Sequence, residues 1–221
     1  MDPITDFIPL PPPRKEDILF RFDRSDPDAN ACLNYTATPE YAYNEGYRVA
    51  ARSLANQVLE TYCDQDILVF PIVYLYRHHL ELILKRLTVL GSSILERELT
   101  DVEIRHLEKH RLDLLWNNFR PILNSVCKEA GWKAPSPEDI EGVNSYIRQL
   151  TEVDPESQSF RYPVSKKGVP SVPHLKHINI RVFAEGMESL SAFLVVIEGG
   201  LDHLDEVKNE MRAEAYRNAD Y

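Results

Sequence analysis

The stretch DILVFPIVYLYRHHLELILKRLTVL, residues 66–90, decides the fold class of this 221-residue chain. Its apolar residues cover most faces of a helix, which is typical of the central, buried helix of a domain. We predict that the helix ends at Gly91, and that Pro71 either kinks it or marks its first turn. The apolar run from Ile67 to Tyr76 is about half as long as the roughly twenty residues that a membrane span needs, so we expect a core helix.

Segments on either side of this stretch carry signals for further helices. N-cap residues followed by proline, or paired with an acidic residue three positions later, mark the helix starts. Apolar residues then recur at steps of three and four, as on one face of an amphipathic helix. The predicted helices are 38–62, 66–90, 100–129, 136–153 and 178–212, with a bend at Gly199 and Gly200. The sequence therefore predicts an all-α fold, a bundle of about five main helices within residues 38–212.

Two segments outside these helices are rich in proline. Five of the fifteen prolines fall within the first thirteen positions, which predicts an extended arm over residues 1–37 with a short strand at 18–22. Such an arm either packs on the body or a partner, or is disordered. The second segment is a loop over residues 154–176, and loops of this length in a compact domain are usually functional or disordered. Residues 213–221 are expected to form a polar tail.

The charge and the cysteine content of the chain limit which binding partners and which cellular compartment we expect. The chain has 25 Lys and Arg against 35 Asp and Glu, a net charge of -10, which disfavours tight, sequence-blind binding to long nucleic acid. A local basic patch can still bind a short RNA or a nucleotide, because the Debye length is only about 8 Å at physiological salt. Three widely spaced cysteines predict reduced thiols, and the N-terminus lacks a secretion signal, so we expect a cytoplasmic location.

Three polar clusters interrupt segments that otherwise form core. They are YRHHLE at residues 76–81, HRLDLLW at 110–116 and FRYP at 160–163. On the central helix, Arg77, Glu81 and Lys85 follow one another at four-residue steps and so form one charged stripe.

These segments resemble the HEPN families, helical bundles named for higher eukaryotes and prokaryotes nucleotide binding. The resemblance rests on YRHHLELILK at 76–85, HRLDLLW at 110–116 and RYP at 161–163, and it covers about residues 66–200. It implies an RNase, or an RNA- or nucleotide-binding protein, of a bacterial defence or toxin–antitoxin system, acting as a homodimer and without a cofactor.

Catalytic members of the family carry an arginine followed, after four to six residues, by a histidine near the start of the last core helix. The match in this chain is Arg105 with His110, which lies mid-chain, whereas Arg161 lies closer to the place that the family pattern gives. The family chemistry implies an arginine on the phosphate and a histidine that moves protons at the ribose 2′-OH, that is, metal-independent RNA cleavage.

Residue types suited to this chemistry are present in the three clusters. We expect Arg77 and Arg161 to contact phosphate, His110 or His78 to carry the proton, and Glu81 to orient an arginine. In the long loop, the predicted substrate-binding residues are Tyr162, Lys166 and Lys167.

Simpler interpretations of the same residues remain open. Arg77 and Glu81 can be a structural ion pair, His110 can cap a helix start, and Arg161 can anchor the loop to the bundle. The chain would then be a non-catalytic module for protein–protein interaction, with a protein partner on its last helix. The sequence HLEKH at 106–110 is not the HExxH of zinc proteases, and no metal site is expected.

Overall fold

The computed structural model describes residues 11–33, 39–165 and 167–219. The chain divides into two units, residues 1–37 and 38–221, which are described separately below. The predicted helix start at Thr38 and the predicted phosphate contact Lys166 lie outside the described residues.

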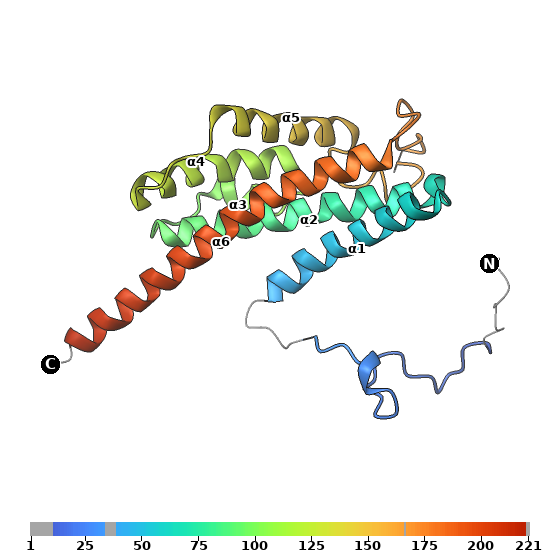
Figure 1. Ribbon diagram of the computed structural model, residues 1–221, viewed down its shortest axis with the longest axis horizontal. Coiled ribbons are helices and arrows are strands. Elements are labelled where there is room, and N and C mark those ends of the chain that lie inside the picture. The colour runs from blue at the N-terminus through green and yellow to red at the C-terminus, as the bar shows by residue number, and fades with distance from the viewer. Residues whose placement is uncertain (1–10, 34–38, 166, 220–221) are drawn as a thin grey trace. The chain divides into compact units, whose positions relative to one another are not determined.

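The second unit is a helical bundle, which confirms the predicted all-α fold (Figure 1). Its described residues contain no β-strand, only a single bridge between Val164 and Pro170 in the long loop. The helices are α1 (Pro39–Thr61), α2 (Gln65–Ile94), α3 (Asp101–Leu107), α4 (Leu112–Ala130), α5 (Pro137–Val153) and α6 (Ile180–Ala219).

Helix α2 is the centre of the bundle, as its sequence predicts. It packs against α1, α4 and α6, and the side chains on most of its faces are buried. By length and composition it could cross a membrane, but half of its most apolar window is buried inside the bundle. A central helix meets the same length and composition criteria, because it too must be apolar on most faces. Its fully buried apolar side chains include Ile72, Tyr76, Leu80, Ile83, Leu84 and Leu87.

Side chains that cap the helices fix several of their ends. Thr100 and Glu103 form the predicted capping box of α3, and Ser136 and Asp139 form one at the start of α5. Each box satisfies backbone N–H groups that have no partner within the helix. Helix α4 ends at Gly131, whose φ of +67° is a left-handed conformation that glycine adopts without steric strain.

Three predicted boundaries were wrong. The region 100–129 is two helices, α3 and α4, because the backbone breaks at 108–111 and leaves the carbonyl of His110 free to accept a hydrogen bond from Arg77. Helix α2 continues past Gly91 to Ile94. Helix α6 is not interrupted at Gly199 and Gly200, and it includes most of the predicted polar tail; its C-terminal part extends past the other helices (Figure 1).

The N-terminal unit is described over residues 11–33. It contains one short 3-10 helix, Pro27–Ala29, and no strand forms at 18–22, where one was predicted. The apolar side chains of this stretch, Ile18, Leu19, Phe20 and Phe22, are exposed.

Candidate functional site

One face of α2 gathers polar and aromatic side chains from four parts of the chain. Along α2 these are Tyr74, His78, Glu81 and Lys85, whose steps of four, three and four residues place them on one side of the helix. Side chains from α1, from the break between α3 and α4, and from the loop after α5 join them. We call the whole group the His78 cluster: Tyr47, Tyr74, His78, Glu81, Lys85, His110 and Arg161.

Glu81 lies at the buried base of the cluster, and three basic side chains contact its carboxylate. Its Oε1 accepts hydrogen bonds from Lys85 Nζ at 2.9 Å and from His110 Nδ1 at 2.8 Å. Its Oε2 lies 3.7 Å from Arg77 Nη1. Burial raises the pKa of Glu81, but the hydrogen bonds from Lys85 and His110 outweigh burial and hold this pKa below its usual value. Glu81 is therefore ionised at neutral pH.

His110 presents an oriented imidazole to solvent. Its side chain is 51% exposed, although Glu81, the carboxylate that holds its Nδ1, is buried. With the Nδ1 proton donated to Glu81, Nε2 is left as a proton acceptor. A carboxylate in this position fixes the tautomer of the ring and stabilises the imidazolium that forms when Nε2 takes up a proton.

His78 lies between two tyrosine rings. Its ring is 4.5 Å, edge-on, from that of Tyr47, and 5.7 Å, nearly parallel, from that of Tyr74. Burial lowers the pKa of His78, and the positive charges of Lys85 and Arg161 add to this effect, while the carboxylate of Glu81 opposes it. His78 is therefore neutral at pH 7 and forms an aromatic group with Tyr74, which is nearly parallel to it, and Tyr47, which is perpendicular to it.

Arg161 joins the cluster from the long loop and packs over the Tyr74 ring. Its guanidinium carbon lies 5.4 Å from the centre of the Tyr74 ring and 5.7 Å from that of Tyr162. Its Nε donates to the carbonyl of Ser157 at 2.7 Å. No carboxylate forms an ion pair with Arg161 in the part of the chain that is described, so its charge is not neutralised locally.

Arg77 is close to the cluster but enclosed. The residue is 0% exposed, and its guanidinium donates to the carbonyl oxygens of Asp154 and His110. The Asp154 carboxylate lies 3.4 Å from its Nε, and the Glu81 carboxylate lies 3.7 Å from its Nη1. The side chain thus joins α2 to the α3–α4 break and to the end of α5. This position matches the structural interpretation of Arg77 and leaves no open face for a phosphate.

The remaining predicted residues lie at or beyond the edge of the cluster. Tyr162 is exposed next to Arg161. Lys167 is exposed in the turn at 165–169, and none of its described contacts involves the His78 cluster. Arg105 is exposed in the last turn of α3, so of the Arg105 and His110 pair only the histidine belongs to the cluster.

The histidines of HLEKH have separate partners. His106 Nδ1 lies 2.8 Å from the side-chain oxygen of Asn118, and His110 binds Glu81. Within the described ranges, no group of three or more His, Cys, Asp or Glu side chains is placed to hold a metal ion.

Sequence reasoning missed two aromatic residues and one acid of this region. Tyr74 precedes His78 by four residues, so helical spacing alone could have placed the two rings together. Tyr47 lies within the predicted helix 38–62, and no local signal ties it to His78. Asp154 is the first residue of the predicted loop 154–176, and no local signal ties its carboxylate to Arg77.

No protein-family model, curated protein or solved structure matches this chain. The structure shows the all-α bundle, while the resemblance to the HEPN families rests on the quoted sequence segments alone and stays a prediction.

Proposed function

We propose that this chain is a HEPN-like, metal-independent endoribonuclease of a bacterial defence or toxin–antitoxin system. In this proposal it acts as a homodimer in the cytoplasm, with the His78 cluster as its site. One observation carries the proposal: the exposed imidazole of His110 is held by the buried carboxylate of Glu81, and both His110 and the unpaired Arg161 lie close enough to His78 for their charges to lower its pKa.

The proposed reaction uses His110 as the general base. Nε2 takes the proton of a ribose 2′-OH, the 2′-oxygen bonds to the adjacent phosphorus, and the bond from phosphorus to the 5′-oxygen breaks. The products are a 2′,3′-cyclic phosphate and a 5′-hydroxyl, which takes its proton from solvent. Glu81 stabilises the imidazolium, and Arg161 stabilises the negative charge that develops on the phosphate.

The aromatic side chains give the cluster a means of holding a single-stranded substrate. Unpaired bases stack on aromatic rings and on arginine, and each such base contributes about 1–3 kcal/mol. Tyr47, Tyr74, His78 and Tyr162 offer such rings, and Arg161 lies over two of them. The acidic balance of the whole chain opposes long polyanions, so we propose a short, single-stranded segment as the substrate.

The direct test is cleavage of a short single-stranded RNA in the presence of EDTA. We expect His110→Asn to lower the cleavage rate by about 10²- to 10⁴-fold, as loss of a general base does. Arg161→Met should lower it by about 10²-fold or more, as loss of a group that stabilises the transition state does. The matched controls are His203→Asn and Arg181→Met, which change exposed residues of α6 and should cleave like wild type.

Equal activity in all five proteins would refute the assignment of the site. Activity that EDTA abolishes would refute the metal-independent reaction.

A non-catalytic interaction module remains the second candidate. It is favoured by exposed apolar side chains on α6, namely Val182, Val195, Val196 and Met211, and by the enclosed position of Arg77. This candidate predicts that no variant of the His78 cluster changes RNA cleavage, and that Val196→Glu weakens self-association or partner binding in sedimentation experiments.

A further inference from the structure

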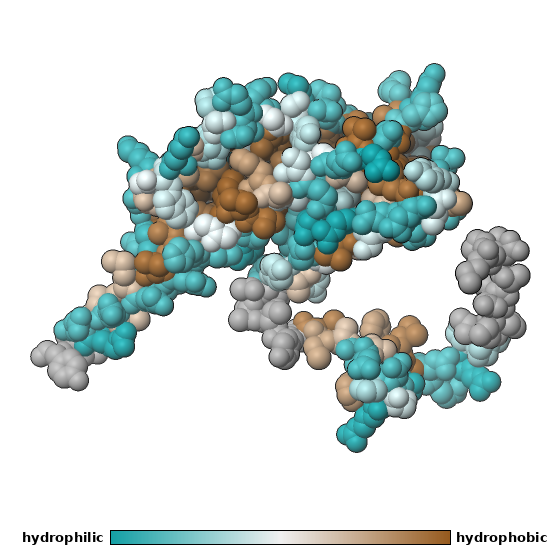
Figure 2. Space-filling view, in the orientation of Figure 1, coloured by the Kyte–Doolittle hydropathy of each residue, from teal (hydrophilic) through white to brown (hydrophobic). Residues whose placement is uncertain are grey.

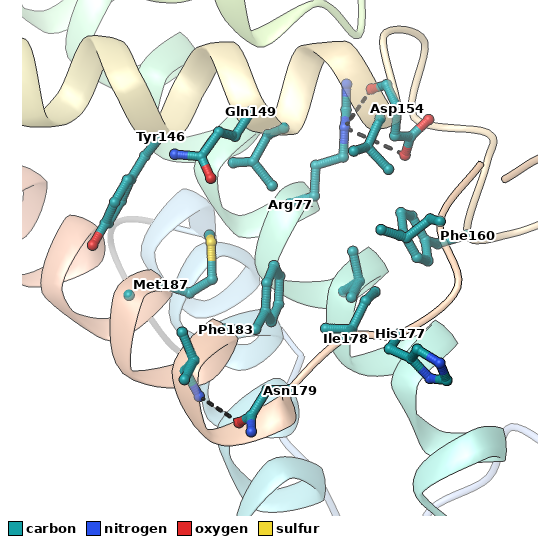
Figure 3. A pocket seen from close by; sticks show the side chains of 16 residues that line it. Arg77, Tyr146, Gln149, Asp154, Phe160, His177, Ile178, Asn179, Phe183 and Met187 are labelled. Carbon is teal, nitrogen blue, oxygen red and sulfur yellow. Dashed lines mark hydrogen bonds and ion pairs between the residues drawn. The ribbon is translucent and has the colours of Figure 1, made fainter.

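A cavity of about 330 Å³ lies between α5, α6 and the loop that joins them, and Arg77 forms part of its wall (Figure 3). It is partly open to solvent. Figure 2 shows hydrophobic side chains gathered on the surface where the end of α5 and the start of α6 meet. The function proposed above makes no use of this cavity.

The walls of the cavity are mostly apolar. Phe183 and Met187 project from α6, Phe160 and Ile178 come from the loop, and Leu150 and Val153 come from α5 (Figure 3). The amide of Gln149 and the ring of Tyr146 reach in from α5 on the opposite side from Met187. Apolar walls with a few polar groups at defined positions are typical of small-molecule sites.

Of the Arg, Asp and His side chains that line the cavity, Arg77 and Asp154 neutralise each other, and His177 is the third. Arg77 Nε donates to the carbonyl of Asp154 at 3.1 Å and lies 3.4 Å from its carboxylate. Both residues are buried, so an ion inside the cavity would lose its hydration without gaining a free counter-charge. The cavity therefore favours an uncharged ligand.

We propose that this cavity binds an uncharged molecule of about two fused rings that carries one hydrogen-bonding group. The size follows from volume, because an apolar cavity of about 150 Å³ holds one benzene molecule. The polar group of the ligand pairs with the amide of Gln149, and its rings contact Phe183 and Met187. The proposal rests on the cavity alone and does not depend on RNA cleavage.

The first test uses 2-naphthol as the probe and the methionine methyl groups as reporters. Met187 lines the cavity, whereas Met211 is exposed near the C-terminal end of α6. In NMR spectra of protein labelled at the methionine methyls, 2-naphthol should shift the Met187 signal saturably and leave that of Met211 unchanged. A Met187 signal that does not move, or that moves no more than Met211, would overturn the proposal.

The second test fills the cavity. Gly186 lines it, and the nearest atoms to a Cβ built on Gly186 belong to Tyr146, at 3.5 Å, so Gly186→Leu places its side chain in the space without a clash of the Cβ. Gly199→Leu is the matched control, because this glycine of α6 faces open space. Calorimetry should show that Gly186→Leu weakens 2-naphthol binding by about tenfold or more, and that Gly199→Leu changes it by less than about twofold. Equal affinity in the two variants would overturn the proposed site.

A charged probe tests the chemical class. Naphthalene-2-sulfonate has the same rings but carries a negative charge, and it should bind wild type about tenfold more weakly than 2-naphthol or worse. If the anion binds as tightly, the preference for an uncharged ligand is wrong. Because the NMR and calorimetric measurements require no catalysis, failure of the proposed ribonuclease activity would leave this result unaffected.

Discussion

Arg77 is a full charge inside the core, and its surroundings explain how the fold tolerates it. Two carboxylates and the carbonyl oxygens of Asp154 and His110 surround the guanidinium. Burial lowers the pKa of Arg77, and the charges of Asp154 and Glu81 oppose that effect. A buried ion pair of this kind adds little net stability, but removal of one partner leaves the other charge buried and unpaired. Arg161 has the same side chain at an exposed position.

Arg77→Met should therefore lower the free energy of unfolding by about 3–5 kcal/mol, because it leaves the buried Asp154 carboxylate without a counter-charge and removes one of the cations that contact Glu81. Arg161→Met should lower it by about 1–2 kcal/mol, since it removes partly exposed contacts of a cation with two aromatic rings and one hydrogen bond to the Ser157 carbonyl. Urea titrations followed by circular dichroism measure both values. A small loss in both variants would contradict the structural role of Arg77.

Glu81→Gln tests whether the carboxylate acts on His110 through its charge. The amide oxygen can still accept from Nδ1, but it no longer stabilises an imidazolium, so RNA cleavage should fall by about 10²-fold or more. The control is Glu198→Gln, because Glu198 is also a buried carboxylate and pairs with Arg86 in contact between α2 and α6. Equal loss of activity in both variants would indicate general damage to the fold.

Helices α2 and α4 approach closely where Gly91 faces Ile122. A Cβ built on Gly91 would lie 2.6 Å from Ile122 Cγ2, which belongs to a stiff, β-branched side chain. The absence of a side chain at Gly91 therefore sets the distance between the two helices. The glycine was predicted to end α2, but it lies within the helix as a packing residue.

Gly91→Ala should lower the free energy of unfolding by about 1–3 kcal/mol, because the added methyl forces α2 and α4 apart. Gly46→Ala in α1 is the control, since nothing lies within 4 Å of its Cβ position. That variant should gain about 0.5–1 kcal/mol from helix propensity. Thermal and urea unfolding measure both, and stabilisation by Gly91→Ala would show that the contact is not tight.

The whole bundle depends on pH through a buried histidine between α1 and α2. His79 is 0% exposed, and its Nδ1 lies 3.2 Å from the carbonyl of Asn44, so the neutral ring donates this hydrogen bond. Burial lowers the pKa of His79 to about 4. The unfolded chain therefore binds a proton at this residue between about pH 6.5 and pH 4, where the folded chain does not.

Stability should rise with pH across that window and fall as the pH is lowered through it. The drop in the pKa of His79 from 6.5 to about 4 corresponds to about 3 kcal/mol of unfolding free energy, which is lost between pH 7 and pH 4. In His79→Asn the amide replaces the donor but does not titrate, so the slope of unfolding free energy against pH should be smaller than in wild type. His203→Asn, which changes an exposed histidine, should keep the wild-type slope.

At the scale of the whole molecule, the chain places a polar surface and an apolar cavity on two sides of one buried arginine. Arg77 contacts His110 and Glu81 of the His78 cluster and also forms part of the wall of the cavity. Phe160 lines the cavity, and its neighbour Arg161 belongs to the cluster. The loop after α5 therefore contributes a side chain to both places.

Local pattern was enough to predict the all-α class, the central helix and several helix starts. Apolar spacing gave the all-α class and the central position of residues 66–90, and the capping boxes at Thr100 and Ser136 gave two helix starts. The stripe of Arg77, Glu81 and Lys85 also followed from four-residue spacing, and both of its ion pairs are present. These features depend on residues within a few turns of one another, so the sequence by itself determined them.

Only the tertiary structure decided which polar side chains are exposed to solvent and which are buried. Arg77 and Arg161 are the same residue type in similar polar clusters, yet Arg77 is sealed by Asp154 and His110 from distant segments, while Arg161 stays exposed. The break between α3 and α4 likewise places the His110 carbonyl where the distant Arg77 donates to it. Burial and pairing across the chain depend on how helices pack, and no local spacing encodes that packing.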